Sequence, residues 1–234
     1  MTQGDDSRRN PPISREILRR LPRFAAFASR QPSDPRDNPF ETGEMAALNP
    51  RSIPERQLAF RLGRAAAHAA LRRIGRDEGP ITTGHDRAPH WPSGIAGAIS
   101  HTSDLGIALV APTQHTDGVG IDVEARRFAP ELYDQVLRLE ERSWMSLEPT
   151  SRRDDIVLAA FSAKESIFKA FYPRVGNFFG FEAASLEPSP AGFVARLVAD
   201  LDPAYPPERT FNVHCRWHGD LVLTWLVLPG TSHS

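Results

Sequence analysis

An α+β fold is predicted for this chain by the order of its apolar patterns. Four segments carry helical patterns, three short apolar runs bounded by turn residues lie between the second and third of them, and four more such runs end the chain. Helices and strands therefore alternate in a pattern that occurs once before about His115 and again after it. We expect two α+β parts, residues 1–115 and 116–234, although no sequence repeat relates them.

The first part begins with residues 1–13, a mostly polar stretch that we expect to be mobile. A short helix is predicted from Ser14 to about Ala28, followed by an irregular connection, rich in proline and aspartate, from Gln31 to Pro54. From Glu55 to Ile74 apolar residues recur at helical spacing, which predicts a long helix that ends at Gly75.

Strands are expected next along the chain. After a turn-rich loop, Gly84–Pro92, the apolar runs Ile95–Ser100 and Gly106–Ala111 predict two strands of a hairpin. A further strand is predicted at Val119–Val123.

The second part is predicted to contain two helices and then strands only. The helices are Pro130–Leu147 and Ser151–Phe171, and Pro173 is expected to stop the second one. The strands of the tail are predicted at Phe178–Leu186, Phe193–Leu201, Thr210–Trp217 and Leu221–Leu228.

Composition indicates an ordinary globular protein. Of the 234 residues 40% are hydrophobic and 24% charged, and the net charge of −1 argues against a general nucleic-acid or membrane-surface binder. The single cysteine, Cys215, excludes an internal disulfide and fits a reducing compartment. The longest strongly apolar run, Leu221–Leu228, is too short to span a bilayer, so a cytoplasmic protein is expected.

Charge is unevenly distributed along the chain. Residues 1–75 hold 14 arginines and 8 acids, a net charge of +6, whereas the other 159 residues hold 14 basic and 21 acidic groups, a net charge of −7. A basic part facing an acidic part suits a phosphorylated ligand held together with a metal ion. The alternative is that the difference reflects only solvated helix faces.

Lys164 and Lys169 are the only lysines, and every other permanently charged base is arginine. A compact ammonium group gives a smaller and denser charge than a guanidinium group, which suits the oxygens of a phosphate. The alternative is composition bias, with Glu165 and Lys169 forming an ordinary helix pair worth roughly 0.3–0.5 kcal/mol.

Two acidic residues, Asp122 and Glu124, lie two positions apart in an apolar strand, so both side chains point to the same face. Like charges on an enclosed face repel, and a divalent cation bound through carboxylate oxygens relieves that repulsion. The alternative is a strand end in water with Arg126 and Arg127 as counter-charges.

A third oxygen ligand is available if the helix presents Glu165 to the same place. Mg²⁺ commonly takes a few carboxylates together with substrate phosphate and water. This set favours attack at phosphorus, with the metal and the lysines neutralising the phosphoryl oxygens. Glu140 or Glu141 is a candidate acceptor for the proton of the nucleophile, and each is equally a candidate solvated helix residue.

Several short motifs stand in one order along the chain. They are Gly63-Arg64, Arg87-Ala-Pro89-His-Trp91-Pro92, Ala98-Ile-Ser100-His101-Thr102, Gly120-Ile-Asp122-Val-Glu124 and Phe161-Ser-Ala-Lys164-Glu165-Ser-Ile-Phe-Lys169-Ala170. In this order, over about residues 55–186, they closely resemble the 4′-phosphopantetheinyl transferases, particularly the siderophore-synthetase-associated and Sfp-like branch.

The resemblance implies transfer of 4′-phosphopantetheine from coenzyme A to a serine of an apo carrier protein of the acyl, peptidyl or aryl kind. The expected cofactor is Mg²⁺ and the expected product is adenosine 3′,5′-bisphosphate. By motif position, Asp122, Glu124 and Glu165 resemble the magnesium ligands. Lys164 and Lys169 match lysines beside the pyrophosphate.

The resemblance also implies further contacts to coenzyme A. These are Arg56 and Arg64 at the 3′-phosphate, Arg87 in a loop where relatives often offer a lysine, and His101 at a phosphate with Ser100 beside it. Glu141 is similar in position to a proposed general base, and Glu140 competes for that role. The catalytic set that the resemblance implies is Glu141, Glu165 and Lys169.

The length of the chain also bears on the arrangement of its two parts. The shorter acyl-carrier synthases have about half this length and assemble their site between subunits, whereas this chain is long enough for both halves. We therefore expect a monomer of two similar α+β halves related by a pseudo-twofold axis, with coenzyme A in the cleft between them. Residues 1–115 would take the 3′-phosphate side, and residues 116–234 the metal and pyrophosphate side. The competing functions are a Mg²⁺-dependent phosphoesterase acting on a small nucleotide and a non-catalytic module that binds coenzyme A or carrier proteins.

Overall fold

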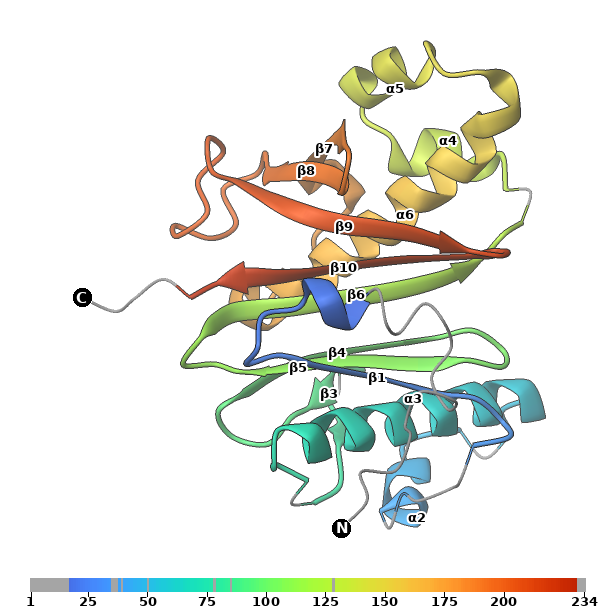
Figure 1. Cartoon of the computed structure of the whole chain (residues 1–234), viewed down its shortest axis with the longest axis vertical. Coiled ribbons are helices and arrows are strands. Elements are labelled where there is room, and N and C mark those ends of the chain that lie inside the picture. Colours follow the sequence, from blue (N-terminus) through green and yellow to red (C-terminus); the bar gives the residue numbers. More distant parts are fainter. Residues whose placement is uncertain are drawn as a thin grey trace.

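The computed structural model describes residues 17–34, 38, 40–49, 51–77, 79–84, 86–127 and 129–230. The lead-in expected at residues 1–13 lies outside this part of the chain. The described residues form an α+β fold with two antiparallel sheets stacked between helices (Figure 1). The prediction of an α+β fold is confirmed.

The first sheet has three strands in the order β1-β5-β4, with α3 (Pro54–Arg73) on its outer face (Figure 1). Its strands are β1 (Ala26–Arg30), β4 (Ile95–His101) and β5 (Gly106–Pro112). The short helix α2 (Glu41–Met45) lies against α3, and a small hairpin of β2 (Thr82–Thr83) and β3 (Pro89–His90) follows α3.

The second sheet has five strands in the order β6-β10-β9-β8-β7. Its strands are β6 (Thr116–Ala125), β7 (Ala184–Ser189), β8 (Gly192–Leu197), β9 (Thr210–His218) and β10 (Leu221–Pro229). Helix α6 (Thr150–Val175) packs on β6 and β10, and α4 (Glu131–Val136) and α5 (Leu139–Met145) lie beyond it (Figure 1). A short 3₁₀ turn, η2 (Phe181–Ala183), precedes β7.

Three apolar clusters fill the spaces between these layers. Strand β1 illustrates the alternation, since Ala26 and Ala28 pack with α3 whereas Phe27 packs with residues of β6 and β10. The third cluster lies between α6 and the five-stranded sheet. Because successive side chains of a strand point to opposite faces, strands that are buried on both sides read as continuous apolar runs.

Two glycines bring α6 unusually close to β6. A β-carbon added at Gly118 would lie 2.3 Å from the carbonyl oxygen of Ala170, and one added at Gly120 would lie 1.8 Å from that of Ser166. The even-numbered positions of β6 therefore face α6, with no room for a side chain at Gly118 and Gly120. The next even-numbered positions, Asp122 and Glu124, continue along the same face toward the end of the strand.

Several predicted elements are confirmed. The helix expected at Glu55–Ile74 is α3, and the expected hairpin Ile95–Ser100 with Gly106–Ala111 is the antiparallel pair β4 and β5. The strand expected at Val119–Val123 is longer at both ends in β6.

Other boundaries were wrong for identifiable reasons. Of the helix expected at Ser14–Ala28, the described part is helical at residues 17–20 and gives way to strand β1, because Pro22 cannot continue the helical hydrogen bonding. The helix expected at Pro130–Leu147 is divided into α4 and α5 by extended backbone at Leu137 and Arg138. Helix α6 continues past Pro173 and ends at Gly176, whose φ of 70° is the left-handed conformation that terminates helices.

The tail strands also differ in extent from the prediction. The 3₁₀ turn η2 occupies part of the expected strand Phe178–Leu186, so β7 begins only at Ala184, and β8 ends four residues before Leu201 at Leu197. Strands β9 and β10 follow the predicted ranges within one residue at each end.

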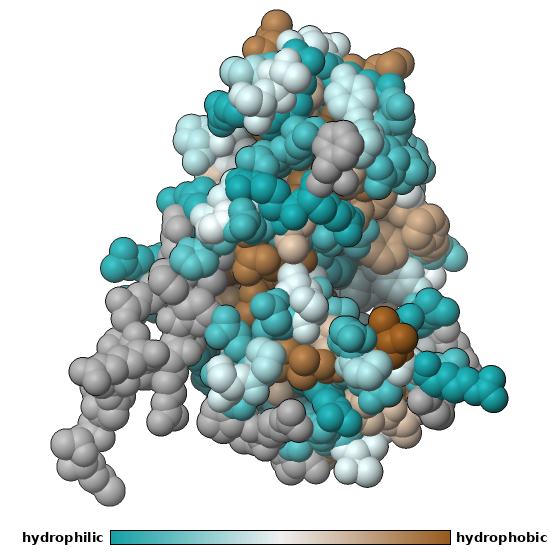
Figure 2. All heavy atoms as spheres, turned by 90° about the vertical axis from the view of Figure 1, so that its right-hand side faces the viewer, coloured by the Kyte–Doolittle hydropathy of each residue, from teal (hydrophilic) through white to brown (hydrophobic). Residues whose placement is uncertain are grey.

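The surface is largely hydrophilic on the face toward which β6 runs. Figure 2 shows this face with hydrophobic side chains in separate groups among hydrophilic ones. Among the described residues, no helix has the length and the apolar character needed to cross a membrane.

Candidate active site

Asp122 is the buried acidic residue at the contact between β6, β4 and α6. This residue is only 3% exposed. Its carboxylate oxygen Oδ1 accepts hydrogen bonds from Ser100 Oγ at 2.8 Å and from Lys169 Nζ at 2.7 Å. Lys169 Nζ also donates to the backbone oxygen of Ile121 at 3.2 Å. The short separation between β6 and α6 therefore brings an ammonium group of the helix onto a carboxylate of the strand.

The second oxygen of Asp122 has a different environment. Oδ2 is buried, and no described group within hydrogen-bonding distance donates to it. Leaving a buried carboxylate oxygen without a donor is costly, so such an atom indicates a missing partner. A cation meets that requirement directly.

Two further carboxylates share the electrostatic environment of Asp122. Burial, followed by the charge of Asp122, raises the pKa of Glu124 to about 7, and the charge of Glu165 adds to this shift. Burial also raises the pKa of Glu165, and the charge of Asp122 contributes in the same direction. The predicted triad thus behaves as a set of mutually repelling carboxylates, whose charge a cation would stabilise.

Asp122, Glu124 and Glu165 are not gathered into a preformed metal site. Within the part of the chain that the structure describes, no three histidine, cysteine, aspartate or glutamate side chains lie close enough together to hold a metal ion. The donor chemistry nevertheless fits a hard divalent cation, because all three groups offer carboxylate oxygens and one buried oxygen lacks a partner.

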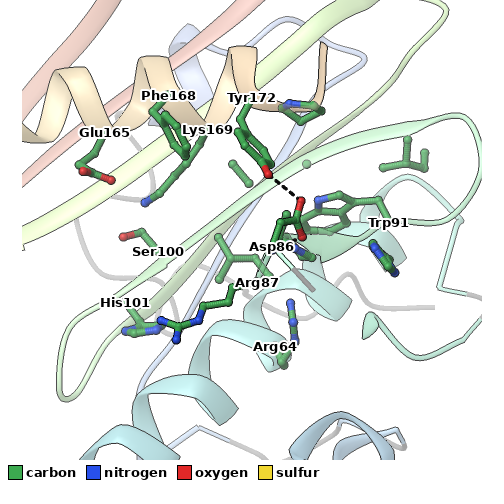
Figure 3. A pocket seen from close by; sticks show the side chains of 18 of the residues that line it. Arg64, Asp86, Arg87, Trp91, Ser100, His101, Glu165, Phe168, Lys169 and Tyr172 are labelled. Atoms are coloured by element: carbon green, nitrogen blue, oxygen red, sulfur yellow. Dashed lines mark hydrogen bonds between the residues drawn. The ribbon is translucent and has the colours of Figure 1, made fainter. Parts of the chain in front are cut away.

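A pocket of about 1110 Å³ opens beside these groups, between α6 on one side and α3, β4 and the β2–β3 hairpin on the other (Figure 3). Glu165 and Lys169 line it from α6, whereas Ser100 and His101 line it from the end of β4. Its volume suits a ligand of the size of a dinucleotide or larger drug-like molecule.

Basic groups line the opposite side of this pocket. Arg64 is buried, donates through NH2 to Thr83 Oγ1 at 2.8 Å, and lies 4.8 Å from the centre of the Phe60 ring. Arg87 extends into the pocket from the tip of the β2–β3 hairpin (Figure 3). Its φ of 67° is unfavourable for a residue other than glycine, which is a strain typical of functional sites.

His101 keeps an exposed face at the end of β4, yet its pKa is lowered, first by the desolvation that the surrounding pocket walls impose and next by the positive charge of Lys169. The ring is therefore mostly neutral at pH 7 and can donate one hydrogen bond while the lysine carries the charge. Arg56 does not line the pocket, but its charge contributes to the same shift, so it lies within electrostatic reach of His101.

A hydrogen bond crosses the mouth of the pocket. Tyr172 of α6 donates through its hydroxyl to Asp86 Oδ2 of the hairpin tip at 2.9 Å (Figure 3). Phe168 packs against Tyr172, with the ring centres 5.1 Å apart, and against the exposed Phe178 at 5.6 Å. The pocket therefore has a charged interior and an aromatic rim.

Comparisons with known proteins identify the family of this chain. The model of the 4′-phosphopantetheinyl transferase N-terminal domain matches residues 44–111, and that of the 4′-phosphopantetheinyl transferase superfamily matches residues 118–223. The chain belongs to the 4′-phosphopantetheinyl transferase superfamily.

Relatives of this transferase include three named proteins. It is 35% identical to 4′-phosphopantetheinyl transferase Svp of Streptomyces mobaraensis over 74% of this chain and 72% of that protein. The identity to 4′-phosphopantetheinyl transferase PptT of Mycobacterium tuberculosis is 32%, over 79% and 85% of the two chains. Enterobactin synthase component D of Salmonella typhi is 33% identical, over 69% and 68%.

Lys164 and Glu141 of the transferase lie away from the pocket, contrary to the expectation that both would meet substrate there. Lys164 is buried and donates through Nζ to Glu141 Oε2 at 2.7 Å and to the backbone oxygen of Val136 at 2.8 Å. Glu141 is only 1% exposed. Its carboxylate also accepts hydrogen bonds from the backbone N–H of Arg138 at 2.7 Å and from that of Leu186 at 2.8 Å. The pair joins α4, α5, α6 and β7.

One hydrogen bond of Glu141 has a signal in the sequence. A glutamate at the third position of a helix commonly accepts a hydrogen bond from the backbone N–H of the residue that caps the helix, as Glu141 does from Arg138. Its competitor Glu140 is exposed and pairs with the Arg138 side chain at 3.0 Å. The residues that sequence reasoning missed are those of the rim, Tyr172, Asp86, Phe168 and Phe178, since ordinary surface aromatics and acids carry no signal of their own.

Proposed function

We propose that this transferase binds coenzyme A in the pocket between α6 and the β2–β3 hairpin, with Mg²⁺ held by Asp122, Glu124 and Glu165. The single observation that carries the proposal is the buried Oδ2 of Asp122, which lacks a donor while Oδ1 of the same group binds Lys169. Transfer of 4′-phosphopantetheine from coenzyme A to a serine of an apo carrier protein is the activity of the family.

Each group of the site has a stated task in this proposal. The bound Mg²⁺ would neutralise the pyrophosphate oxygens and stabilise the charge that develops on them during transfer. Lys169 presents a second positive charge at the same place, and it is already fixed by Asp122 and the Ile121 carbonyl. Ser100 orients Asp122, and His101 donates to a phosphate oxygen.

The nucleotide end of coenzyme A would lie toward Arg64 and Arg87. A guanidinium group binds a phosphate through two parallel hydrogen bonds, and the Nε of Arg64 is a buried donor for which no described acceptor is present. We assign Arg64 to the 3′-phosphate, Arg87 to the hairpin side of the pocket, and Arg56 to long-range attraction.

The proton of the attacking serine needs an acceptor that substrate can reach. Glu165 lines the pocket, so a bound substrate can reach its carboxylate, and burial raises its pKa above the ordinary value. Glu141 would have to leave Lys164 and two backbone donors before it could accept a proton. We therefore propose Glu165 for this step, with Lys164 and Glu141 holding α5 and β7 against α6.

We further propose the division near residue 115 and the pseudo-twofold relation of the two parts. Support comes from the two family models that match on either side of residues 112–117, and from the two sheets, each with one long helix on its outer face. A monomer is also proposed, because one chain lines the pocket from both parts. The mass in analytical ultracentrifugation tests the monomer, and an obligate trimer would overturn it. A cytoplasmic location is proposed because the single cysteine fits a reducing compartment.

The carrier proteins are proposed to belong to a siderophore or nonribosomal peptide pathway. Support comes from the relatives named enterobactin synthase component D. No observation in the structure favours the phosphoesterase or the non-catalytic module, and the family membership favours the transferase.

The test is incubation with coenzyme A, Mg²⁺ and a panel of apo carrier domains, followed by intact mass measurement. The expected result is addition of phosphopantetheine to at least one carrier. Glu165→Gln should abolish most of the addition, whereas the matched control Glu187→Gln, at an exposed position of β7, should not. Nucleotide release without any carrier modification would instead favour the phosphoesterase.

A further inference from the structure

A buried polar cluster lies where α2 packs against α3 (Figure 1). Its centre is His68, which is completely buried one helical turn after Arg64. Glu44 of α2, 2% exposed, and Asp77, after the end of α3, bond to the ring from opposite sides. We name these three residues the histidine clamp.

Both nitrogens of the His68 ring bond to carboxylates. Nε2 lies 2.8 Å from Glu44 Oε1, and Nδ1 bonds to Asp77 Oδ1. A carboxylate only accepts, so both ring nitrogens must donate, and only the protonated imidazole can do so. Burial by itself lowers the pKa of His68, but the hydrogen bonds to Glu44 and Asp77 outweigh it and raise the pKa above its ordinary value.

The charges around the clamp come from every element packed against it. Glu44 comes from α2 and Asp77 from the segment that follows α3, while Arg64 and Arg72 come from α3 itself. Arg72 NH1 donates to Asp77 Oδ2 at 2.8 Å, and Asn38 donates to Glu44 Oε2 at 2.7 Å. The carboxylates of the clamp are thus held from outside as well as by His68.

The clamp is connected to the pocket through the start of the β2–β3 hairpin. Glu44 Oε1 accepts the backbone N–H of Ile81 at 2.7 Å, two residues before Thr83. Thr83 Oγ1 in turn accepts the hydrogen bond from Arg64 NH2. A closed path therefore runs from Arg64 along α3 to His68, across to Glu44, and back through Ile81 and Thr83 to Arg64.

We propose that His68 is a positioning residue for the nucleotide end of coenzyme A, acting through Glu44, Ile81 and Thr83 to orient the guanidinium group of Arg64. The inference rests on the proposed function, because it takes Arg64 as the group that binds the 3′-phosphate. His68 itself does not line the pocket and touches no substrate.

The experiment compares Michaelis constants for coenzyme A and for dephospho-coenzyme A, which lacks the 3′-phosphate, in the wild type and in His68→Gln. Glutamine keeps one donor but turns an oxygen toward a carboxylate, so the clamp opens. The KM for coenzyme A should rise about tenfold, a change worth about 1.4 kcal/mol, with kcat within about twofold of the wild type. The KM for dephospho-coenzyme A should stay the same, so the ratio between the two substrates should fall.

A purely structural role would give a different result. A variant that is only less stable loses active molecules, which lowers activity with both substrates and leaves the ratio of their KM values unchanged. Ala70→Gly is the matched control, because it weakens α3 by about 1 kcal/mol at a buried position without touching the clamp. It should keep the wild-type ratio.

Glu44→Gln provides a second variant if His68→Gln does not fold. It keeps an oxygen for Ile81 but loses the charge, and the ratio should shift in the same direction by a smaller factor. An unchanged ratio in the folded variants would overturn the inference while leaving the transferase activity intact. A wild type that transfers nothing would instead overturn the proposed function.

Discussion

Two buried carboxylate sites in this molecule have opposite character. In the histidine clamp, burial raises the pKa of Glu44, but hydrogen bonds from His68, Asn38 and Ile81 outweigh it, so the pKa is lowered overall. At the end of β6, burial and like charges raise the pKa of Glu124 to about 7, and Asp122 keeps one oxygen without a donor. The first site is complete within the protein, whereas the second keeps an unpaired buried oxygen that we propose a bound cation satisfies.

This difference distinguishes carboxylates that stabilise the fold from carboxylates that are proposed to take part in the reaction. A buried charge with all its partners holds segments together, and removing one partner leaves the other charge uncompensated. A buried charge that lacks a partner is tolerated where function requires it. The following predictions test whether the two sites respond in these two ways.

The largest effect is expected on stability, from Glu44→Ala. The substitution leaves His68⁺ with one carboxylate and the N–H of Ile81 without its acceptor, so the free energy of unfolding should fall by about 3–5 kcal/mol. Denaturant unfolding followed by circular dichroism measures it. Glu187→Ala, at an exposed position, is the control and should change stability by less than about 0.5 kcal/mol. Equal stability of the two variants would contradict a complete clamp.

Asp122→Asn should have the converse profile. Loss of this charge removes the partner of Lys169 and one of the proposed cation ligands, so kcat/KM for carrier modification should fall about a hundredfold or more. Stability should stay near that of the wild type, because repulsion with Glu124 and Glu165 is relieved at the same time. Asp134→Asn, whose side chain is 77% exposed, is the matched control. A variant that is much less stable than the wild type but keeps its specific activity would contradict the assignment.

Much of this contrast could be predicted from the sequence. The spacing of Asp122 and Glu124 indicated that they share one face of a strand, and in the structure Lys169 of α6 reaches Asp122 on that face. The spacing did not show which carboxylates would be satisfied. Glu141 was expected at the reaction and Lys164 at the pyrophosphate, yet they pair with each other, since the approach of α4, α5 and α6 is decided by packing over long sequence separations.

The same limit explains the fold errors. Helix α3 and the β4–β5 hairpin follow local periodicity and were predicted correctly, whereas β1 is a strand because it adds to the edge of β5, 80 residues away in register between Ala28 and Ala108. The histidine clamp was not predicted, because Glu44 stands in a stretch without periodicity. Only the folded chain brings it to His68.

The pH dependence of stability should expose the clamp. Because the folded-state pKa of His68 is raised, its contribution is complete below its ordinary pKa of about 6.5 and is lost as the pH rises through the higher folded value. The difference in unfolding free energy between the wild type and His68→Gln should therefore shrink as the pH rises above about 6.5. A difference that grows with pH would show that His68 is neutral.

The smallest effect is expected at the rim of the pocket. Tyr172→Phe removes the hydrogen bond to Asp86 across the pocket mouth, a contact worth about 0.5–1.5 kcal/mol, so the KM for coenzyme A should change about threefold with kcat preserved. Tyr133→Phe removes a hydroxyl away from the pocket and serves as the control. Identical constants for both variants would show that the bridge has no part in binding.

Calorimetric titration of Mg²⁺ into an equimolar complex of the transferase and coenzyme A tests the central claim most directly. Wild type and Asp134→Asn should bind one ion per chain with the same affinity, and Asp122→Asn should bind it at least about tenfold more weakly. Equal Mg²⁺ affinity in all three proteins would contradict the assignment of the buried, donor-free oxygen of Asp122 to a metal.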